Sequence, residues 1–310
     1  MPSGSRGRWA HDELTEPARW AQVSVAGRVR KQLNRVLRPL GVRIESLAAE
    51  KAESSRLAEL VRVGQFDRPI LPLLDSFEHL DPATTFAAVR RYADETSRFA
   101  ATDGRTGYAF ENDYFTSPDA EVAYAMAREI RPGRIVEVGS GNSTRLFRAA
   151  ILDGDLETEL ISIDPAPRTE VASIADRVLR KRLEEVDEAE LVGWFEAGDF
   201  LFIDSSHRIE AGNDVVSLLL RIVPKLKAGV IVHLHDIFLP FEYPREWLVE
   251  FGWLWNEQYL VQAMLQGPGS FGVLWAGHYL QRTIPEFASH FASPVVGRGS
   301  SLWLRTEQRA

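Results

Sequence analysis

The 310-residue sequence contains no cysteine. This absence excludes disulfides, thiolate metal sites and a cysteine nucleophile. Long hydrophobic runs are also lacking: a stretch such as VVSLLL, residues 215–220, is far shorter than the roughly 20 residues of a membrane span. No apolar signal core follows the N-terminal methionine, and we therefore expect a cytoplasmic location.

Acidic residues outnumber basic ones, and the basic charge is concentrated in one stretch. The chain has 44 Asp and Glu against 36 Lys and Arg, and its net charge of −8 argues against nucleic-acid binding. Between Glu16 and Glu45 there is no acid, but there are seven basic residues: Arg19, Arg28, Arg30, Lys31, Arg35, Arg38 and Arg43. The apolar residues of this stretch fall on one helical face: Val29, Leu33, Val36, Leu37 and Leu40.

This basic amphipathic stretch has two interpretations. A helix of this kind can lie on an anionic membrane, which would give residues 19–43 a peripheral membrane contact. It can also pack on the main domain and leave its basic face in solvent. The segregation of the two faces does not by itself separate these interpretations, and we favour the packed helix.

The chain changes character near residue 107. Residues 1 to about 17 have the composition of a disordered segment, and residues 18–64 have helical patterns. The turn cluster TDGRTG, residues 102–107, is a candidate linker. We therefore predict an N-terminal extension over 1–107, with a disordered start followed by helices, and a main domain over 108–310.

In the main domain, short apolar segments alternate with helical patterns. The predicted strands are residues 134–138, 160–164, 199–204, 229–236, 271–276 and 300–306. The predicted helices are residues 117–130, 143–152, 169–185 and 213–226. This alternation is typical of a doubly wound, Rossmann-like α/β domain, whose parallel sheet is covered on both faces. In such sheets ligands bind at the carboxyl ends of the strands.

The first predicted strand runs into the sequence EVGSGNST, where Gly139 and Gly141 precede a helix that begins near Ser143. Glycine allows a tight turn close to a ligand, and the start of a helix offers free N–H groups. Rossmann-like folds hold a nucleotide cofactor at this position. Asp164 ends the next strand and can accept the ribose hydroxyls, although an aspartate before Pro165 can also simply stabilise a turn.

The glycine motif lacks the third glycine of a pyrophosphate site, and Glu137 places a carboxylate in the strand just before it. An acid here repels a pyrophosphate but suits a cation. The combination fits S-adenosylmethionine, which carries an ammonium and a sulfonium and no phosphate. The same features count against an NAD(P)-dependent oxidoreductase, the alternative enzyme class. A further alternative is a pseudo-enzyme or scaffold that binds the cofactor without chemistry.

Five motifs occur in the order VEVGSGNST, ISIDPAP, GDFLFIDSSH, GVIVHLHDIFLPFEYP and WNEQYLVQAML. Through these motifs, residues 110–305 resemble a bacterial family of class I S-adenosylmethionine-dependent methyltransferases. The resemblance implies a seven-stranded sheet whose last strand is antiparallel. It also implies that Asp164 contacts the ribose, that Asp187 lies near the adenine, and that the methionine end is lined by Glu137, Gly139, Gly141 and Ser143.

Polar residues also end the fourth and fifth predicted strands. Asp204 ends the fourth strand and is followed closely by His207, and His235 and Asp236 end the fifth. The resemblance implies that Asp204 lies at the cofactor crevice and that the acceptor site is built here. A hydroxyl acceptor must lose its proton, and either histidine can remove it near neutral pH. We therefore take His207, His235 and Asp236 as candidate catalytic residues.

A divalent metal is the alternative at these strand ends. Catechol-type and macrolide-sugar methyltransferases hold magnesium with an Asp after strand four and a pair of residues after strand five. The matching positions here are Asp204, His235 and Asp236. A histidine in place of an acid favours a softer ion such as manganese or iron over magnesium. We favour a base without metal slightly over a metal site.

Residues 239–260 form an aromatic insertion. Tyr243, Trp247 and Trp255 can form a lid that contacts a ring or sugar face, or the insertion can pack on the sheet or at an oligomer interface. Glu257 and Gln258 need polar partners among such neighbours. We predict methyl transfer from S-adenosylmethionine, with a hydroxyl oxygen of a small-molecule or saccharide-like acceptor as its target.

Overall fold

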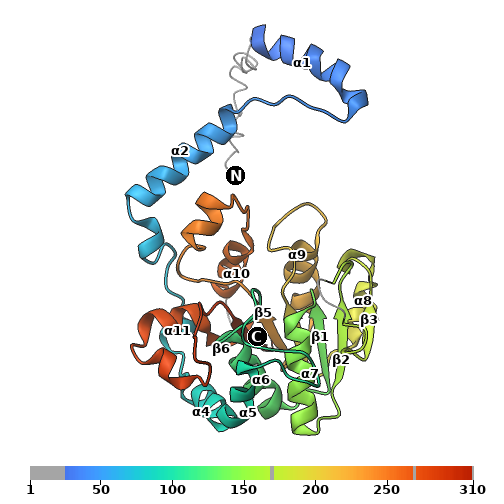
Figure 1. Ribbon diagram of the computed structural model, residues 1–310, viewed down its shortest axis with the longest axis vertical. Coiled ribbons are helices and arrows are strands. Elements are labelled where there is room, and N and C mark those ends of the chain that lie inside the picture. The colour runs from blue at the N-terminus through green and yellow to red at the C-terminus, as the bar shows by residue number, and fades with distance from the viewer. Residues whose placement is uncertain (1–24, 168–170, 268–269, 309–310) are drawn as a thin grey trace, which may run out of the picture. The chain divides into compact units, whose positions relative to one another are not determined.

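Seven strands form one mixed sheet in the computed structural model, which describes residues 25–167, 171–267 and 270–308 (Figure 1). The strands are β1 Arg134–Val138, β2 Glu159–Ile163, β3 Arg177–Leu179, β4 Phe200–Ile203, β5 Ile231–Leu234, β6 Phe271–Ala276 and β7 Leu302–Thr306. Their order is β3-β2-β1-β4-β5-β7-β6, and β7 runs antiparallel to both of its neighbours. The predicted Rossmann-like sheet with an antiparallel last strand is confirmed.

Helices connect the strands and precede them. The α-helices are α1 Val25–Leu37, α2 Ala48–Arg62, α3 Asp75–Glu78, α4 Ala83–Arg91, α5 Ala93–Ser97, α6 Asp119–Ile130, α7 Asn142–Gly154, α8 Glu188–Gly193, α9 Asp214–Ser217, α10 Glu257–Leu265 and α11 Gly277–Thr283. The 3-10 helices are η1 Arg38–Leu40, η2 Gln65–Asp67, η3 Arg98–Ala100, η4 Leu183–Glu185, η6 Val223–Lys225 and η8 Phe287–His290, and the π-helices are η5 Leu218–Ile222 and η7 Glu246–Glu250.

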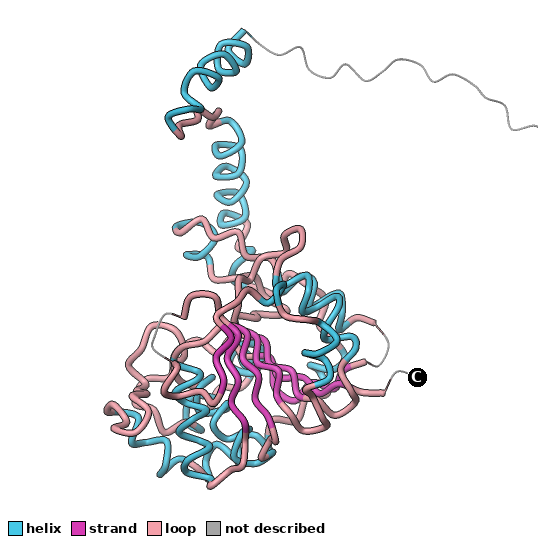
Figure 2. The backbone as a smooth tube through the Cα atoms, turned by 90° about the vertical axis from the view of Figure 1, so that its right-hand side faces the viewer, coloured by secondary structure: helices cyan, strands magenta, loops and turns pink. Residues whose placement is uncertain are grey.

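The sheet has an apolar core on each face, because its strands are apolar at nearly every position. Side chains alternate between the faces with a period of two. Ile135 therefore faces one core, together with residues of α4, α6 and α7, whereas Val136 faces the other, together with residues of α8, α9 and α10. Figure 2 shows helices on both sides of the strands. The covered faces leave the strand ends as the place where polar side chains gather.

The predicted helix over residues 169–185 is wrong. Residues 169 and 170 lie outside the described residues, and the described remainder contains strand β3 and the short 3-10 helix η4 instead of an α-helix. Three residues of this segment pair with β2, from Arg177 opposite Ile161 to Leu179 opposite Ile163. Pairing with the edge of the sheet outweighs the local helical preference here, as tertiary contacts commonly do.

Contacts between residues divide the chain into two compact units, and the boundary between them follows Arg56. This division does not coincide with the predicted boundary at residue 107, because Phe86 and Phe99 pack in the same core as Tyr108. The prediction of helices before residue 64 agrees with α1 and α2, whereas the predicted disorder of residues 1–17 lies outside the described residues. None of the helices in the described ranges is both long and apolar enough to cross a lipid bilayer.

Gly139 sets the close approach of β1 and β4. Its φ of +87° lies in the left-handed region, and a Cβ atom on it would lie 1.9 Å from the backbone oxygen of Asp204. The amide of Asp204 in turn donates to the carbonyl of Val138 at 3.0 Å. Only glycine allows this backbone contact without moving one strand end.

The Gly139→Ala substitution should therefore lower the free energy of unfolding by more than about 2 kcal/mol, from backbone strain and the clash together. Gly104→Ala is the matched control, because a Cβ atom there meets nothing within 4 Å. Urea unfolding of both variants measures the difference. Equal stabilities would contradict the role given to Gly139.

Candidate functional site

A cavity of about 900 Å³ lies at the carboxyl ends of β1, β2, β4 and β5. Residues after these strands and three tryptophans of the aromatic insertion line it. The lining includes Gly139, Ser140, Asp164, Arg182, Glu184, Asp204, His207, Asp214, His235, Asp236, Trp247, Trp253 and Trp255, with Asp113 and Tyr114 from the segment before α6. This is the edge of the sheet where the sequence predicted a ligand site.

Asp164 lines the cavity and also holds the glycine loop. Its carboxylate accepts hydrogen bonds from the amide of Ser140 at 2.9 Å and from the Ser140 hydroxyl at 3.0 Å. It also accepts from the amide of Ala166 at 2.8 Å, which is the turn contact considered for an aspartate before proline. Asp164 therefore has a structural role, and its place in the cavity is compatible with the proposed ribose contact.

Most of the other residues expected at the cofactor lie outside the cavity lining. Gly139 is part of the lining, whereas Glu137, Gly141 and Ser143 are not. Asp187, expected near the adenine, is also outside the lining, and its carboxylate accepts from the amide of Glu190 at 2.8 Å, at the start of α8. These residues shape the loop and helix starts around the cavity.

Glu137 is fully buried within β1. Burial raises the pKa of its carboxyl to about 8, and the nearby hydroxyls of Ser143 and Thr144 oppose this only in part. The carboxyl is therefore mainly protonated at pH 7. A cation bound beside this carboxyl would favour its ionised form.

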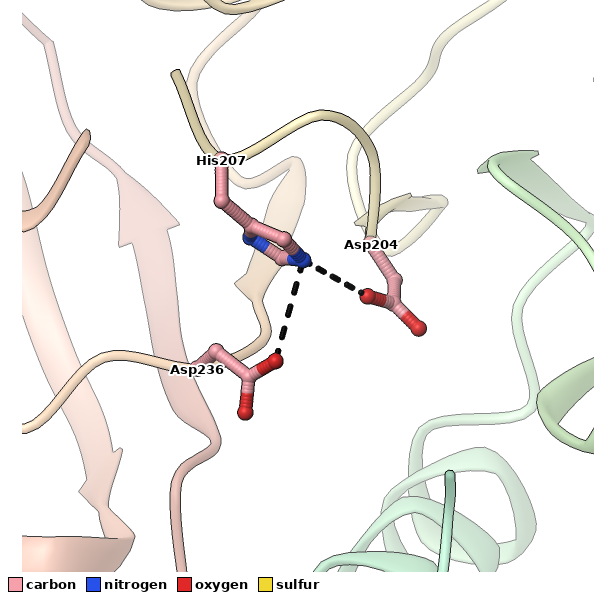
Figure 3. A group of neighbouring side chains, drawn as sticks. All are labelled: Asp204, His207 and Asp236. Atoms are coloured by element: carbon pink, nitrogen blue, oxygen red, sulfur yellow. Dashed lines mark ion pairs between the residues drawn. The ribbon is translucent and has the colours of Figure 1, made fainter. Parts of the chain in front are cut away.

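The ends of β4 and β5 bring four predicted residues together. The Nε2 atom of His207 lies 3.2 Å from Oδ1 of Asp204 and 3.7 Å from Oδ2 of Asp236, and the imidazole points between the two carboxylates (Figure 3). The Nδ1 atom of His235 lies 3.7 Å from Oδ1 of Asp204 and 3.5 Å from Oδ2 of Asp236. Two imidazoles thus converge on one pair of aspartates.

A second carboxylate stands behind each imidazole. Glu257 Oε2, at the start of α10, lies 3.2 Å from Nδ1 of His207, and Asp119 Oδ2, at the start of α6, lies 3.6 Å from Nε2 of His235. Both acids are almost completely buried. Asp119 also accepts from the amide of Ser300 at 2.8 Å. Glu257 was expected to need a polar partner, and His207 is that partner. The sequence did not predict that Asp119 contacts His235, because an acid in the first turn of a helix is common and does not indicate such a contact.

These carboxylates keep both histidines protonated. Burial by itself lowers the pKa of His207, but hydrogen bonds to Asp204 and Glu257 outweigh it and raise the pKa to about 10. The acids around His235 likewise outweigh its burial and raise its pKa well above the usual value. Burial tends to raise the pKa of Asp204, but the two histidines hold it well below its ordinary value. The site is built to hold positive charge between its two aspartates.

One donor atom each from Asp204, His207 and Asp236 lie within 4.8 Å of one another, so these residues can hold a metal ion in place of the proton. The sequence had placed His235 in this set. The structure adds His207, whose Nε2 faces both aspartates. Two carboxylates with imidazole nitrogen suit ions such as manganese, iron or zinc better than magnesium, which prefers oxygen ligands.

His207 and Asp236 both adopt left-handed backbone conformations, with φ of 57° and 58°. Two other non-glycine residues in the described part of the chain have positive φ, and both end helices: Arg131 after α6 and Asp155 after α7. Positive φ is uncommon outside glycine, although Asp and His tolerate it better than most residues. Strained conformations of this kind cluster at functional sites.

The aromatic insertion supplies one wall of the cavity. Trp253 and Trp255 are stacked with their ring centroids 4.6 Å apart, and the Trp255 ring lies 4.2 Å from that of His207. Trp247 and Trp255 line the cavity as the lid interpretation predicted, but Tyr243 does not. The Tyr243 hydroxyl instead accepts from the amide of Gln258 at 3.0 Å, in the first turn of α10. The sequence analysis did not single out Trp253, which also lines the cavity.

A family model described as a methyltransferase domain matches residues 136–237. This match confirms the predicted resemblance to the class I methyltransferases. The matched segment runs from β1 to just beyond β5 and contains both the glycine loop and the aspartate–histidine cluster. This part of the chain is therefore similar to a methyltransferase domain. No curated protein matches the sequence.

Several solved structures are similar to the chain at low sequence identity. A methyltransferase from Podospora anserina with bound S-adenosylhomocysteine is 17% identical, with 86% of this chain and 100% of that chain covered and a TM-score of 0.39. An O-methyltransferase from Bacillus cereus is 11% identical, with 83% and 99% covered and a TM-score of 0.37. A branched-chain polyamine synthase from Thermus thermophilus is 14% identical, with 82% and 78% covered and a TM-score of 0.38.

The raised pKa of Glu137 predicts a pH-dependent stability. The folded protein binds this proton more tightly than the unfolded chain does, so the stabilisation is complete below pH 4.5 and is lost as the pH rises towards 8. A single group of this kind contributes a slope of up to about 1.4 kcal/mol per pH unit. The Glu137→Gln variant should show a shallower fall in unfolding free energy over this range.

Urea unfolding of wild type and variant at several pH values measures the two slopes. His207 retains its own raised pKa in the variant, so some fall with pH should remain. Identical slopes would show that Glu137 is ionised in the folded protein.

Proposed function

We propose that the protein transfers a methyl group from S-adenosylmethionine to a hydroxyl oxygen of a small-molecule or saccharide-like acceptor. The main support is that a single cavity joins the Asp164 end of the glycine loop to the cluster of Asp204, His207, His235 and Asp236. A cofactor and an acceptor can therefore lie side by side in it, which an in-line transfer between them requires.

The charge of the cavity fits a cationic cofactor. Among the described residues, six acids line it, against Arg182 and the two protonated histidines: Asp113, Asp164, Glu184, Asp204, Asp214 and Asp236. Such a lining repels the pyrophosphate of NAD and favours a ligand that carries an ammonium and a sulfonium. Asp164 accepts three hydrogen bonds, and a carboxylate has about four acceptor sites, so capacity remains for a ribose hydroxyl.

When bound, S-adenosylmethionine supplies an electrophilic methyl group on sulfur, and the protein must position and deprotonate the acceptor hydroxyl. A neutral His207 protonated on Nδ1 would donate a hydrogen bond from this N–H to Glu257, which leaves the Nε2 lone pair for the acceptor. Glu257 thus selects the tautomer that can act as a base. Once it has lost the proton that its raised pKa favours, His207 is the first candidate base. His235 is the second, because its Nε2 faces the buried Asp119.

A metal-assisted form of the same reaction is the second candidate. A divalent ion held by Asp204, His207 and Asp236 would lower the pKa of a bound hydroxyl, as metals do for bound water. In this form His235 or a water molecule would take the proton. The three tryptophans fit either form, because aromatic rings pack well against the apolar faces of sugars and planar rings.

Asp164→Ala should weaken S-adenosylhomocysteine binding at least about tenfold, since one good hydrogen bond to a charged group is worth about 1.5 kcal/mol or more. Asp187→Ala is the matched control. It also removes a carboxylate that stabilises a helix start, but Asp187 lies outside the cavity lining. Titration followed by tryptophan fluorescence gives both affinities. Unchanged affinity in Asp164→Ala would remove this residue from the cofactor site.

His207→Ala should lower turnover at least about a hundredfold, the usual contribution of a general base, and leave S-adenosylhomocysteine affinity within about twofold. The exposed His79 provides the control variant His79→Ala. The assay follows labelled methyl transfer to a panel of phenols, polyols and sugars. Full activity of His207→Ala with any acceptor would reject His207 as base and as metal ligand.

The same assay separates the two forms of the proposal. Protein treated with EDTA should stay active if a base works alone. Loss of activity that manganese, iron or zinc restores would establish the metal-assisted form. Binding of S-adenosylhomocysteine without transfer to any acceptor in the panel would favour the pseudo-enzyme alternative.

A further inference from the structure

Apolar and basic residues are completely segregated around α1 and η1. At about 100° per residue, the apolar side chains fall within an arc of about 120°. They are Val29, Leu33, Val36, Leu37 and Leu40. The basic side chains occupy the remainder: Arg28, Arg30, Lys31, Arg35 and Arg38. This segregation identifies a helix with one apolar and one cationic side.

The apolar side of this helix is exposed. Val36 is 72% exposed, Leu40 73%, Val29 50% and Leu33 46%. The described residues up to Arg56 therefore do not cover it. Single exposed apolar residues are common, but a contiguous exposed row along one helix usually marks a contact with a partner or a membrane.

The segment after the helix adds to this apolar surface. Gly41 turns the chain in a left-handed conformation, and Asn34 then binds Ile44 through both backbone groups, at 2.8 Å and 2.6 Å. These bonds hold residues 42–44 beside α1. Val42 and Ile44 are themselves 51% and 42% exposed. Residues 25–44 thus form a small unit whose apolar side chains are largely in solvent.

The charge of this unit identifies the chemistry of its partner. Seven of the 36 basic residues lie between Glu16 and Glu45 without an acid, which leaves 29 basic residues against 44 acidic ones elsewhere. The unit is therefore cationic on an otherwise acidic chain. A nucleic acid would use the basic side alone, and an uncharged protein groove would use the apolar side alone. An anionic lipid surface uses both, because acyl chains accept the apolar side while headgroups attract the arginines.

We propose that residues 25–44 bind the surface of an anionic membrane, with Val29, Leu33, Val36 and Leu40 in the boundary between headgroups and acyl chains. Residues 25–56 leave the apolar side uncovered, and the cationic side lies beside it. A lipid surface would use both sides, whereas the packed helix considered from the sequence would use the apolar side alone. The proposal is independent of the proposed methyl transfer.

Co-sedimentation of the full chain with lipid vesicles tests the proposal. Vesicles of phosphatidylcholine with one third phosphatidylglycerol should retain the protein, and vesicles of phosphatidylcholine alone should retain much less. Binding should weaken as salt is raised, because screening reduces the attraction of the arginines to the headgroups. Absence of binding to the anionic vesicles at low salt would overturn the proposal, as would equal binding to both compositions.

Val36→Asp should lower the fraction bound at least about fivefold, because it places a charge in the apolar side. Val295→Asp is the matched control: both valines are 72% exposed, and the change in net charge is the same. Equal loss in the two variants would overturn the assignment to α1. Both variants should retain the thermal unfolding midpoint of the wild type, which shows that lost vesicle binding does not reflect unfolding.

The mass of the lipid-free protein tests the competing partner, a second copy of the chain. The proposal predicts the same mass for wild type and Val36→Asp. A dimer that Val36→Asp dissociates would assign the apolar side to self-association and overturn the membrane proposal. Titration of Val36→Asp with S-adenosylhomocysteine is a separate readout, so a failure of the proposed methyl transfer would not be mistaken for a failure here.

Discussion

The backbone contact between Gly139 and Asp204 is the constraint on which the candidate site depends. It brings the end of β1 against the end of β4, with room for no side chain between them. The glycine loop and the first aspartate of the aspartate–histidine cluster are therefore neighbours. β5 continues this arrangement, since the amide of His235 donates to the carbonyl of Ile203 at 2.9 Å. The glycine loop and the cluster of Asp204, His207, His235 and Asp236 thus line one cavity, because the ends of β1, β4 and β5 are in register.

Electrostatics gives the two ends of this cavity different properties. At the β1 end, burial favours the neutral form of Glu137, and Asp164 accepts hydrogen bonds from Ser140 of the glycine loop. At the β4 and β5 ends, carboxylates stabilise positive charge on the imidazoles. A buried cluster of like charges is costly unless opposite charges balance it. A proton or a metal ion between Asp204 and Asp236 provides that balance, and removal of the proton is the step that creates a base.

The sequence predicted the sheet well because its strands are apolar runs, and it predicted the cluster because parallel strands end at the same edge. It missed β3, where three residues pair with the edge of the sheet inside a helical pattern. It also missed the roles of Asp119 and Glu257. These acids belong to helices that are distant in sequence, and only the folded chain shows that they stand behind the histidines. The protonation of Glu137 likewise depends on burial.

The most direct test of the account is calorimetric titration of the wild-type protein with S-adenosylhomocysteine and, separately, with NAD. The acidic cavity and the Asp164 carboxylate predict micromolar binding of S-adenosylhomocysteine and no binding of NAD. Binding of NAD alone would contradict the assignment of the cavity to a cationic cofactor. Binding of neither would show that the protein does not use this cavity for a nucleoside cofactor.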